Sequence, residues 1–195
     1  MARQIINNGT IAGDGTGETL FTAFDKTNDN FVELYKVAGW ASYAKSIATA
    51  QTITSTDSKL VIDGGGTESN SSYLPLEIRG ISALWDTTNN KITPISIGDG
   101  YTMRIDFEIT GKTGNPNGLD ISLGIGGGAT PSNVITERVV STLKAVPYNI
   151  SVAFPFYTLS DFKTNGGQIF LKTDTGTLTI TARMISIHRI SSGTI

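Results

Sequence analysis

The sequence predicts a mainly β protein, an antiparallel sandwich or barrel, preceded by one helical segment. From about residue 50 onward, apolar and polar residues alternate with a period of two in many short runs, which is typical of strands with one buried face. Clusters of Gly, Asn, Asp and Pro separate these runs and are typical of tight turns. Ahead of them, the apolar residues of the N-terminal part follow a helical spacing instead.

The stretch GDGTGETLFTAFDKTNDNFVELY, residues 13–35, is expected to contain the helix. Thr16 can cap its N-terminus, and Glu18 suits the positive end of the helix dipole. The apolar positions are alternately four and three residues apart, with Thr27 filling one gap: Leu20, Phe24, Phe31, Leu34 and Ala38. An isolated helix of this length is marginal in water. The heptad-like stripe therefore predicts packing against its own domain, copies of itself or a larger assembly.

The clearest strand is YTMRIDFEIT, residues 101–110, whose odd-numbered residues are mostly apolar and whose even-numbered residues are polar. The same alternation occurs in LDISLGIG (119–126) and YNISVAFPF (148–156), where Pro155 predicts an edge strand or a bulge. Further strands are expected near 52–62, 74–85, 91–97, 134–143, 168–173 and 177–190. Short strands in this number, without a repeat of fixed period, favour a sandwich or barrel.

The last expected strand, GTLTITARMISIHRI, carries apolar residues on both of its faces. Met184 and Ile190 fall on one face, and Ile185 and Ile187 fall on the other. A strand with two apolar faces is covered on both sides. The pattern therefore predicts a neighbouring subunit against Ile185 and Ile187, in a homotrimer held largely by the β domain.

The composition argues against several classes of protein. Charged residues make up 16% of the chain and the net charge is −2, which gives no reason to expect nucleic acid or an anionic membrane as a partner. The absence of cysteine excludes disulfides, thiolate catalysis and cysteine-based zinc sites. No apolar run approaches the ~20 residues of a membrane span. MARQIINNGT lacks the apolar core of a signal peptide, so synthesis in a cytoplasm is expected.

The sequence predicts no catalytic residue, no cofactor and no metal. The single histidine, His188, lies in the last strand, where a packed or interface position is expected. Asp106 and Glu108 share a strand face, as the two carboxylates of a glycosidase would. Arg104 beside them favours a solvated charged face instead. The glycine-rich GIGGGA (124–129) is followed by TPSN and not by the helix that a dinucleotide site needs.

Two kinds of binding remain open at this point. A calcium ion near Asp63 and Glu68 is one alternative. Tyr157 lies off the apolar face of its strand and is a candidate exposed aromatic residue that could stack on a sugar. A recognition groove could be built from the loops 111–118 and 126–133, because loops on a rigid scaffold are where recognition is usually placed.

The N-terminal residues also form a longer pattern, G-T-x-x-x-D-G-T-G-[DE]-x-L-x-T-A-F-x-K-[IV]-N-x-N-F-x-E-L-Y. The chain matches it at Gly9, Thr10, Asp14, Gly15, Thr16, Gly17, Glu18, Leu20, Thr22, Ala23, Phe24, Lys26, Asn28, Asn30, Phe31, Glu33, Leu34 and Tyr35, and departs from it at Thr27. The pattern resembles an N-terminal motif of small virion structural proteins of tailed bacteriophages. The remainder, with LWDTTNNKITP as an expected hairpin, resembles a jelly roll of the tumour-necrosis-factor type, which phages use as trimeric fibre knobs and capsid decorations.

These resemblances imply two parts: an N-terminal virion-anchoring and trimerisation segment with the helix over 1–48, and a jelly-roll β-sandwich over 49–195. They imply a non-enzymatic virion structural protein, a trimeric capsid decoration or short fibre that displays its β domain outward. The expected assembly interface consists of Leu20, Phe24, Phe31, Leu34, Tyr35, Ile185 and Ile187.

The expected partners are the chain itself, in a homotrimer, and other virion proteins of the capsid, neck or tail. The expected location is the virion, after synthesis in the host cytoplasm, with neither nucleic acid nor membrane as a partner. The alternative is a receptor-binding tail-fibre tip that recognises a host surface polysaccharide. An exposed groove of aromatic and polar residues would favour that alternative, whereas an extensive anchoring interface would favour the structural role.

Overall fold

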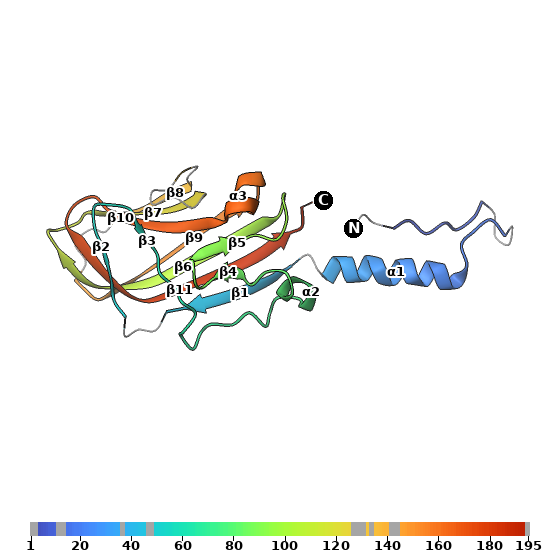
Figure 1. The fold of residues 1–195 in the computed structure, drawn as a ribbon, viewed down its shortest axis with the longest axis horizontal. Helices are drawn as coiled ribbons and strands as arrows, with labels where there is room; N and C mark the ends of the chain where they lie inside the picture. The colour runs from blue at the N-terminus through green and yellow to red at the C-terminus, as the bar shows by residue number, and fades with distance from the viewer. Residues whose placement is uncertain are drawn as a thin grey trace.

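The computed structural model describes residues 4–10, 15–35, 38–45, 49–125, 132, 135–140 and 145–193. Helix α1 (Leu20–Tyr35) precedes a sandwich of two β-sheets. In Figure 1, α1 lies beyond the end of the sandwich at which the described chain also ends. Among the helices in the described part of the chain, none has the length and apolar character that a bilayer crossing needs.

One sheet has the strand order β1–β11–β6–β9, and β2 also pairs with β11. Its strands are β1 (Gly39–Ala44), β2 (Gln51–Ile53), β6 (Gly100–Thr113), β9 (Tyr148–Tyr157) and β11 (Thr177–Ser191). The other sheet has the order β4–β5–β10–β7–β8, and β3 pairs with β10. Its strands are β3 (Ser58–Lys59), β4 (Leu84–Asp86), β5 (Lys91–Thr93), β7 (Gly118–Ile125), β8 (Ile135–Val140) and β10 (Gly167–Thr173). The pairings between these strands are antiparallel.

The period-two patterns form the core as the sequence predicts. The odd-numbered residues of β6 from Tyr101 to Ile109 are buried, and so are the even-numbered residues of β9 from Ile150 to Phe156. They meet the apolar residues of β7 and β10 from the other sheet. Pro155 lies opposite Thr102 on β9, which is the last strand in its sheet order. The expectation of an edge strand is therefore confirmed.

Two short helices were not predicted. Helix α2 (Leu76–Arg79) follows Pro75 within the expected strand 74–85, whose strand character is confined to β4. Helix α3 (Ser160–Asn165) links β9 to β10. The expected hairpin is confirmed, because β4 and β5 pair in register from Leu84 opposite Thr93 to Asp86 opposite Lys91.

The boundary expected at residue 49 needs correction, because β1 already belongs to the sandwich. This strand pairs with β11 from Gly39 opposite Arg189 to Ala44 opposite Met184. Its sequence, GWASYA, consists mainly of small residues and lacks a clear alternation, so its strand character is not visible in the pattern. The sandwich thus begins at Gly39, four positions after the end of α1 at Tyr35.

A β-bulge accounts for the two-sided pattern of β11. The register of β11 against β6 shifts between Thr181 and Met184, and Ala182 within the shift has φ +47. An extra residue in a strand moves the core-facing positions from one parity to the other. Leu178 and Ile180 are accordingly buried before the bulge, whereas the buried residues after it are odd-numbered.

This bulge corrects the expected positions of Ile185 and Ile187. Both side chains are 0% exposed and belong to the core of their own chain. They are therefore not available for contact with a neighbouring subunit. Met184 and Ile190, on the opposite face, are half-buried and exposed respectively, so the second apolar face is not a continuous covered surface.

The bulge also turns Arg183 inward, where its side chain is buried. Its guanidinium donates to three backbone carbonyls, those of Val61 (3.0 Å), Ile180 (3.1 Å) and Thr49 (3.0 Å). Burial lowers the pKa of this guanidinium, and the charge of Asp63 acts in the opposite direction. A buried cation is tolerated when its donors are hydrogen-bonded. Arg183 thereby connects β11 to the residues just before β2 and just after β3.

Candidate assembly interface

The N-terminal arm, residues 4–10, runs back along α1 (Figure 1). The Asn30 side chain accepts a hydrogen bond from the Gln4 amide at 2.9 Å and donates one to the Gln4 carbonyl at 3.0 Å. The Gln4 side chain donates to Asp29 at 2.8 Å. Asn30 thus holds the backbone of the arm by the same paired hydrogen bonds that a neighbouring strand would make.

Lys26 and Glu18 hold the arm at its middle. The Lys26 ammonium donates to the Ile5 carbonyl at 3.1 Å and forms an ion pair with Glu18. The Glu18 amide donates to the Asn7 carbonyl at 2.9 Å. Gly17 lies so close to the arm that an added Cβ would be 3.1 Å from the Asn8 carbonyl carbon. Several polar and glycine positions of the N-terminal pattern therefore serve this local structure.

The arm covers one side of α1, where Ala23, Lys26, Thr27 and Asn30 are half-buried. Thr27 was expected to fill a gap in the apolar stripe. Its hydroxyl instead donates to the Ala23 carbonyl, one turn earlier, at 2.8 Å. The Thr27 hydroxyl is therefore satisfied by the helix backbone, on the side of α1 that the arm covers.

The other side of α1 presents exposed apolar residues. The exposed fractions are 72% for Leu20, 76% for Phe21, 59% for Phe24, 54% for Phe31 and 43% for Val32. At about 100° per residue, these five positions fall within an arc of about 120°. Burying one such side chain contributes ~1.5–3 kcal/mol. The polar side chain of Asn28 also falls within this arc. An exposed, largely apolar face of this kind marks an interaction site; we call the five apolar residues the apolar face of α1.

Three of the seven predicted interface residues lie on this face: Leu20, Phe24 and Phe31. Phe21 and Val32 were not predicted, because neither position fits the alternating spacing of four and three residues. Their helical angle, 100° per residue, would have placed them beside the other three. The side chains of Leu34 and Tyr35 lie outside the described part of the structure.

A second apolar surface lies at the end of the sandwich nearer to α1, and it consists of Ile97, Tyr157, Leu159 and Ile190. These side chains are exposed, and Tyr157, at 66%, confirms the expected exposed aromatic residue. The backbone places them together. Gly98 donates to the Thr158 carbonyl at 2.7 Å. Gly100 pairs with Tyr157 on one side and with Ser191 on the other. We call these four residues the end patch.

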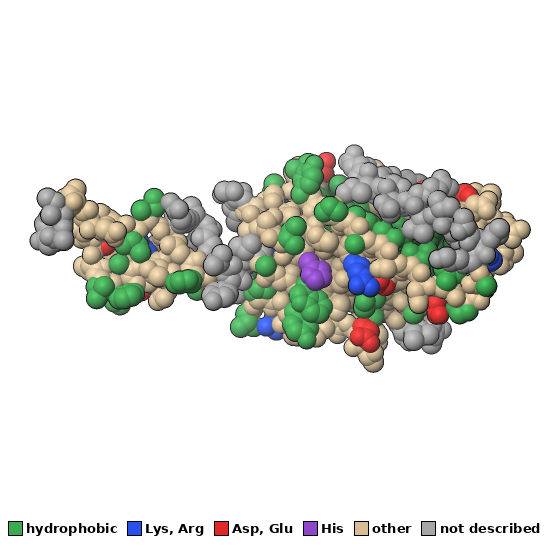
Figure 2. All heavy atoms as spheres, turned by 180° about the vertical axis from the view of Figure 1, so that it is seen from behind, with side chains coloured by type: hydrophobic (Ala, Val, Ile, Leu, Met, Phe, Trp, Pro, Cys, Tyr) green, Lys and Arg blue, Asp and Glu red, His purple; other side chains and the backbone are tan. Residues whose placement is uncertain are grey.

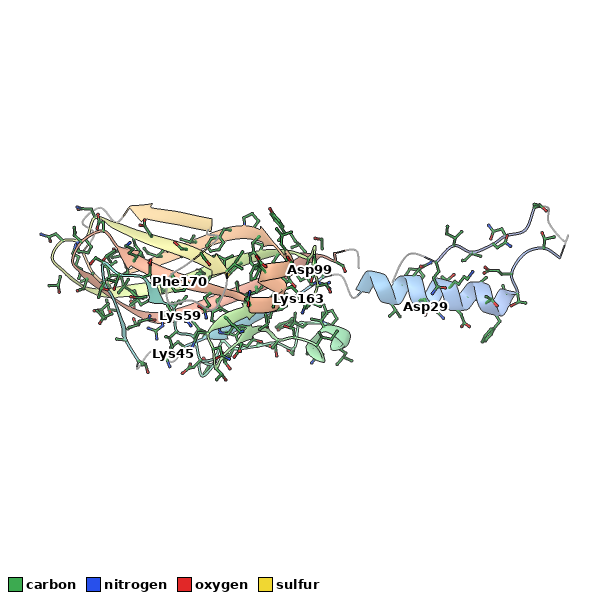
Figure 3. The ribbon with its side chains drawn as sticks, turned by 45° about the horizontal axis from the view of Figure 1, so that its top comes forward. Asp29, Lys45, Lys59, Asp99, Lys163 and Phe170 are labelled. Atoms are coloured by element: carbon green, nitrogen blue, oxygen red, sulfur yellow. The ribbon has the colours of Figure 1, made fainter. Side chains whose placement is uncertain are left out.

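A buried ion pair supports the end patch from beneath. Both side chains are covered, and Arg189 donates to Asp99 through Nε at 3.0 Å and through an Nη at 2.8 Å. The Tyr101 hydroxyl and the amides of Ser96 and Gly193 also donate to this carboxylate, at 2.9, 3.0 and 2.8 Å. Figure 3 labels Asp99 at this end of the sandwich.

The pKa of Asp99 follows from these contacts. Burial raises it, but the hydrogen bonds from Arg189, Gly193 and Tyr101 and the charge of Arg189 lower it more, so the pKa lies below the ordinary 3.8. Burial also raises the pKa of the Tyr101 hydroxyl, which keeps it protonated and able to donate. Five donors to one buried carboxylate make this end of the sandwich a rigid platform.

The candidate catalytic groups form a charged outer face, as expected. Arg104 donates to Asp106 at 2.8 and 2.9 Å and to Ser151 at 3.1 Å. The Thr181 hydroxyl donates to Glu108 at 3.2 Å. In the part of the chain that the structure describes, no three His, Asp or Glu residues are grouped so that they could hold a metal ion. Asp63 forms its ion pair with Lys45.

Of the two positions expected for His188, packed or at an interface, the packed one is wrong. The side chain is exposed on the outer face of β11, and its ring stacks at 5.7 Å on Trp40. Trp40 stacks in turn on Tyr73 at 4.4 Å. Figure 2 shows His188 beside hydrophobic side chains on this face. Of the two loops considered for recognition, most of 126–133 lies outside the described residues.

No protein-family model and no curated protein sequence matches this chain. Among solved structures, Eiger TNF from S. frugiperda is similar to it, with a TM-score of 0.51 and 9% identity over 82% of this chain and 97% of that chain. The fold is a jelly-roll sandwich of two antiparallel sheets. The PRD1 vertex protein P5 is more distant, with a TM-score of 0.44 and 12% identity over 78% of this chain and 97% of that chain. At this identity, the first likeness establishes the fold of the jelly roll and nothing about its function.

Proposed function

We propose that the chain is a non-enzymatic structural protein of a bacteriophage virion, a trimeric capsid decoration or short fibre. In this proposal, the arm and α1 anchor the chain, and the jelly roll stands outward from the particle. The observation that carries the proposal is the apolar face of α1. Leu20 and Phe21 on this face are more than two-thirds exposed, at 72% and 76%. A single helix of 16 residues gains most of its stability from packing, so this face requires a partner.

The polar and the apolar residues of the N-terminal pattern have different roles, and this difference supports the proposal. Its polar residues Glu18, Lys26 and Asn30 hold the arm against one side of α1. Its apolar residues Leu20, Phe24 and Phe31 are left uncovered on the other side. An apolar arc of about 120° is wide enough for the helix to pack against a partner along its length. The same residue pattern resembles that of phage virion proteins.

The alternative, a receptor-binding fibre tip, draws on the exposed aromatic Tyr157. That residue belongs to the end patch, at the end of the sandwich from which the chain continues to α1 (Figure 1). A protein anchored through α1 would turn this end toward the particle and away from the host. The position of the end patch therefore favours a contact within the assembly.

The proposal is tested first on the purified full-length chain. Sedimentation should show three chains of 20.7 kDa in one particle. Phe24→Asp should abolish that association, because a charge in an apolar seam costs several kcal/mol. Thr22→Asp places the same charge on another exposed face of α1 and should leave the association intact.

The second test uses purified particles of the virus that encodes the chain. Wild type and Thr22→Asp should be present in the particles, and Phe24→Asp should be absent from them. Cryo-electron microscopy of the particles would show whether the chain sits on the capsid, neck or tail. Normal incorporation of Phe24→Asp would refute anchoring through the apolar face of α1.

A further inference from the structure

A hollow of about 450 Å³ lies between the β4–β5 hairpin and α3. The hairpin lines it with Asp86, Lys91 and Thr93, and α3 lines it with Lys163. Figure 3 labels Lys163 at the same end of the sandwich as Asp99. The volume is within the range of small-ligand sites, ~300–1,000 Å³.

Two lysines cross between the two walls of the hollow, one from α3 toward β5 and one from β5 toward α3. Lys163, on α3, donates to the Pro94 carbonyl just after β5 at 3.0 Å. Lys91, on β5, reaches the Asn165 carbonyl at the end of α3, at 3.4 Å. Each ammonium has three donors, and one of them makes this contact. Two N–H groups on each side of the hollow remain able to hold an anion.

The walls of the hollow are fixed by packing. Gly166 has φ +76, and an added Cβ would lie 2.5 Å from the Ile92 carbonyl oxygen, so the end of α3 abuts β5 closely. Phe162 anchors α3 in the core, with its ring 5.4 Å from that of Phe156. The spacing of the two lysine stems is therefore set before any ligand arrives, which reduces the entropic cost of binding.

One carboxylate, Asp86, lines the hollow and offsets part of the charge of Lys91, which lies opposite it across the β4–β5 pair. Asp86 accepts hydrogen bonds from the amides of Thr88 and Asn89, both at 2.9 Å, and from the Asn89 side chain at 2.7 Å. These hydrogen bonds, that of the Asn89 side chain foremost, lower the pKa of Asp86 although burial raises it. Asp86 is thus ionised but turned into its own tight turn. The hollow keeps an excess of positive charge.

We propose that this hollow binds a carboxylate-bearing sugar, an acidic residue of a glycan. The two ammonium groups would hold the carboxylate by charge-assisted hydrogen bonds. The volume of about 450 Å³ exceeds what a lone carboxylate needs and accommodates a ring. Ile81, which is 69% exposed at the rim, offers apolar contact to the ring, and the Thr93 hydroxyl, which is hydrogen-bonded to the Ser82 hydroxyl at 2.9 Å, also lines the hollow. This site is separate from the apolar face of α1. Because anchoring through α1 would turn this end of the sandwich toward the particle, binding is proposed for the free chain and does not depend on the virion role.

The test is a titration of the full-length protein, by calorimetry or NMR, with glucuronate, glucose and acetate. Glucuronate and glucose differ only in the carboxylate. Glucuronate should bind, glucose should bind at least about tenfold more weakly, and added salt should weaken the binding of glucuronate. Acetate should bind more weakly than glucuronate. Equal binding of acetate and glucuronate would overturn the sugar assignment, and no binding of glucuronate at millimolar concentration would overturn the site.

Variants locate the site. Lys91→Met and Lys163→Met should each weaken glucuronate binding by about tenfold, the factor that corresponds to one lost charged contact. Lys172→Met, which alters an exposed lysine of β10 outside the hollow, is the matched control and should leave binding unchanged. Ile81→Asp adds a negative charge at the exposed rim without touching either lysine bridge, and it should also weaken binding. Unchanged affinity in Ile81→Asp, or equal losses in Lys163→Met and Lys172→Met, would refute the proposal.

Discussion

The core of the jelly roll and the surface of α1 are both rich in large apolar side chains, but only the first set is covered. Ile105 and Ile121 come from different sheets and are 0% exposed, because each sheet covers the inner face of the other. Phe24 and Phe31 have no second layer over them within the described chain, and both are more than half exposed. The core of the jelly roll is therefore covered by the chain itself, whereas the apolar face of α1 is left exposed by the described part of the chain.

The N-terminal arm does not cover the apolar face of α1. It is joined to α1 by hydrogen bonds through Gln4, Lys26 and Asn30, and it covers the polar side of the helix. A hydrogen bond contributes only about 0.5–1.5 kcal/mol net, less than the burial of one large apolar side chain. The contacts of the arm thus order it against α1 and leave the apolar face of α1 uncovered.

The largest expected difference between the two regions comes from placing the same charge in each. Ile185→Asp puts a carboxylate in the sealed core, at a cost comparable to the whole stability of a domain, ~5–15 kcal/mol. We expect no folded protein from this variant. Phe24→Asp should leave the thermal unfolding of the jelly roll unchanged. Circular dichroism melts of both variants provide the measurement, and unfolding of the jelly roll by Phe24→Asp would show that α1 belongs to its core.

A smaller loss is expected from Asp99→Asn in the jelly roll. Removing one partner of a buried ion pair leaves Arg189 uncompensated, which costs about 3–5 kcal/mol. Chemical denaturation at neutral pH would measure this loss. Asp161→Asn changes an exposed carboxylate of α3 and serves as the control, with little expected effect. Equal stability of the two variants would show that the network under the end patch contributes nothing.

The same carboxylate predicts a pH dependence. Because the folded pKa of Asp99 lies below the ordinary 3.8, its contribution is present above that value. The contribution is lost as the pH falls from 3.8 through the lowered folded pKa. Wild type should therefore lose more stability than Asp99→Asn over this acid range. Parallel acid-unfolding curves for the two proteins would contradict the assignment.

The smallest effect is expected in the arm. Asn30→Ala removes both hydrogen bonds to Gln4. It should weaken the attachment of the arm to α1 by about 1–3 kcal/mol without affecting the jelly roll. Hydrogen exchange at the Gln4 amide should become faster by one to two orders of magnitude, about tenfold for each 1.4 kcal/mol. Asn28→Ala, at an exposed position of the same helix, is the matched control. Unchanged exchange in Asn30→Ala would show that the arm is held by other contacts.

Much of the fold could be predicted from the pattern of apolar and polar residues within each segment. The alternation in β6 and β9, the edge position of Pro155 and the apolar positions Leu20, Phe24 and Phe31 on α1 could all be predicted from neighbouring residues. The candidate ligand hollow could not, because Lys91 and Lys163 are 72 positions apart and meet only where α3 abuts β5. Nothing in the sequence near either lysine indicates the other.

The sequence by itself determined the class of the fold and the apolar positions Leu20, Phe24 and Phe31 of α1, since periodicity is a property of each segment alone. Only the tertiary structure decided which face of β11 is buried, because a single left-handed residue, Ala182, shifts the parity of the strand. It likewise decided that Ile185 and Ile187 lie in the core, and that Asp99 pairs with Arg189 across 90 positions. Bulges and long-range ion pairs depend on how whole sheets pack, and the pattern within one strand carries no record of that packing.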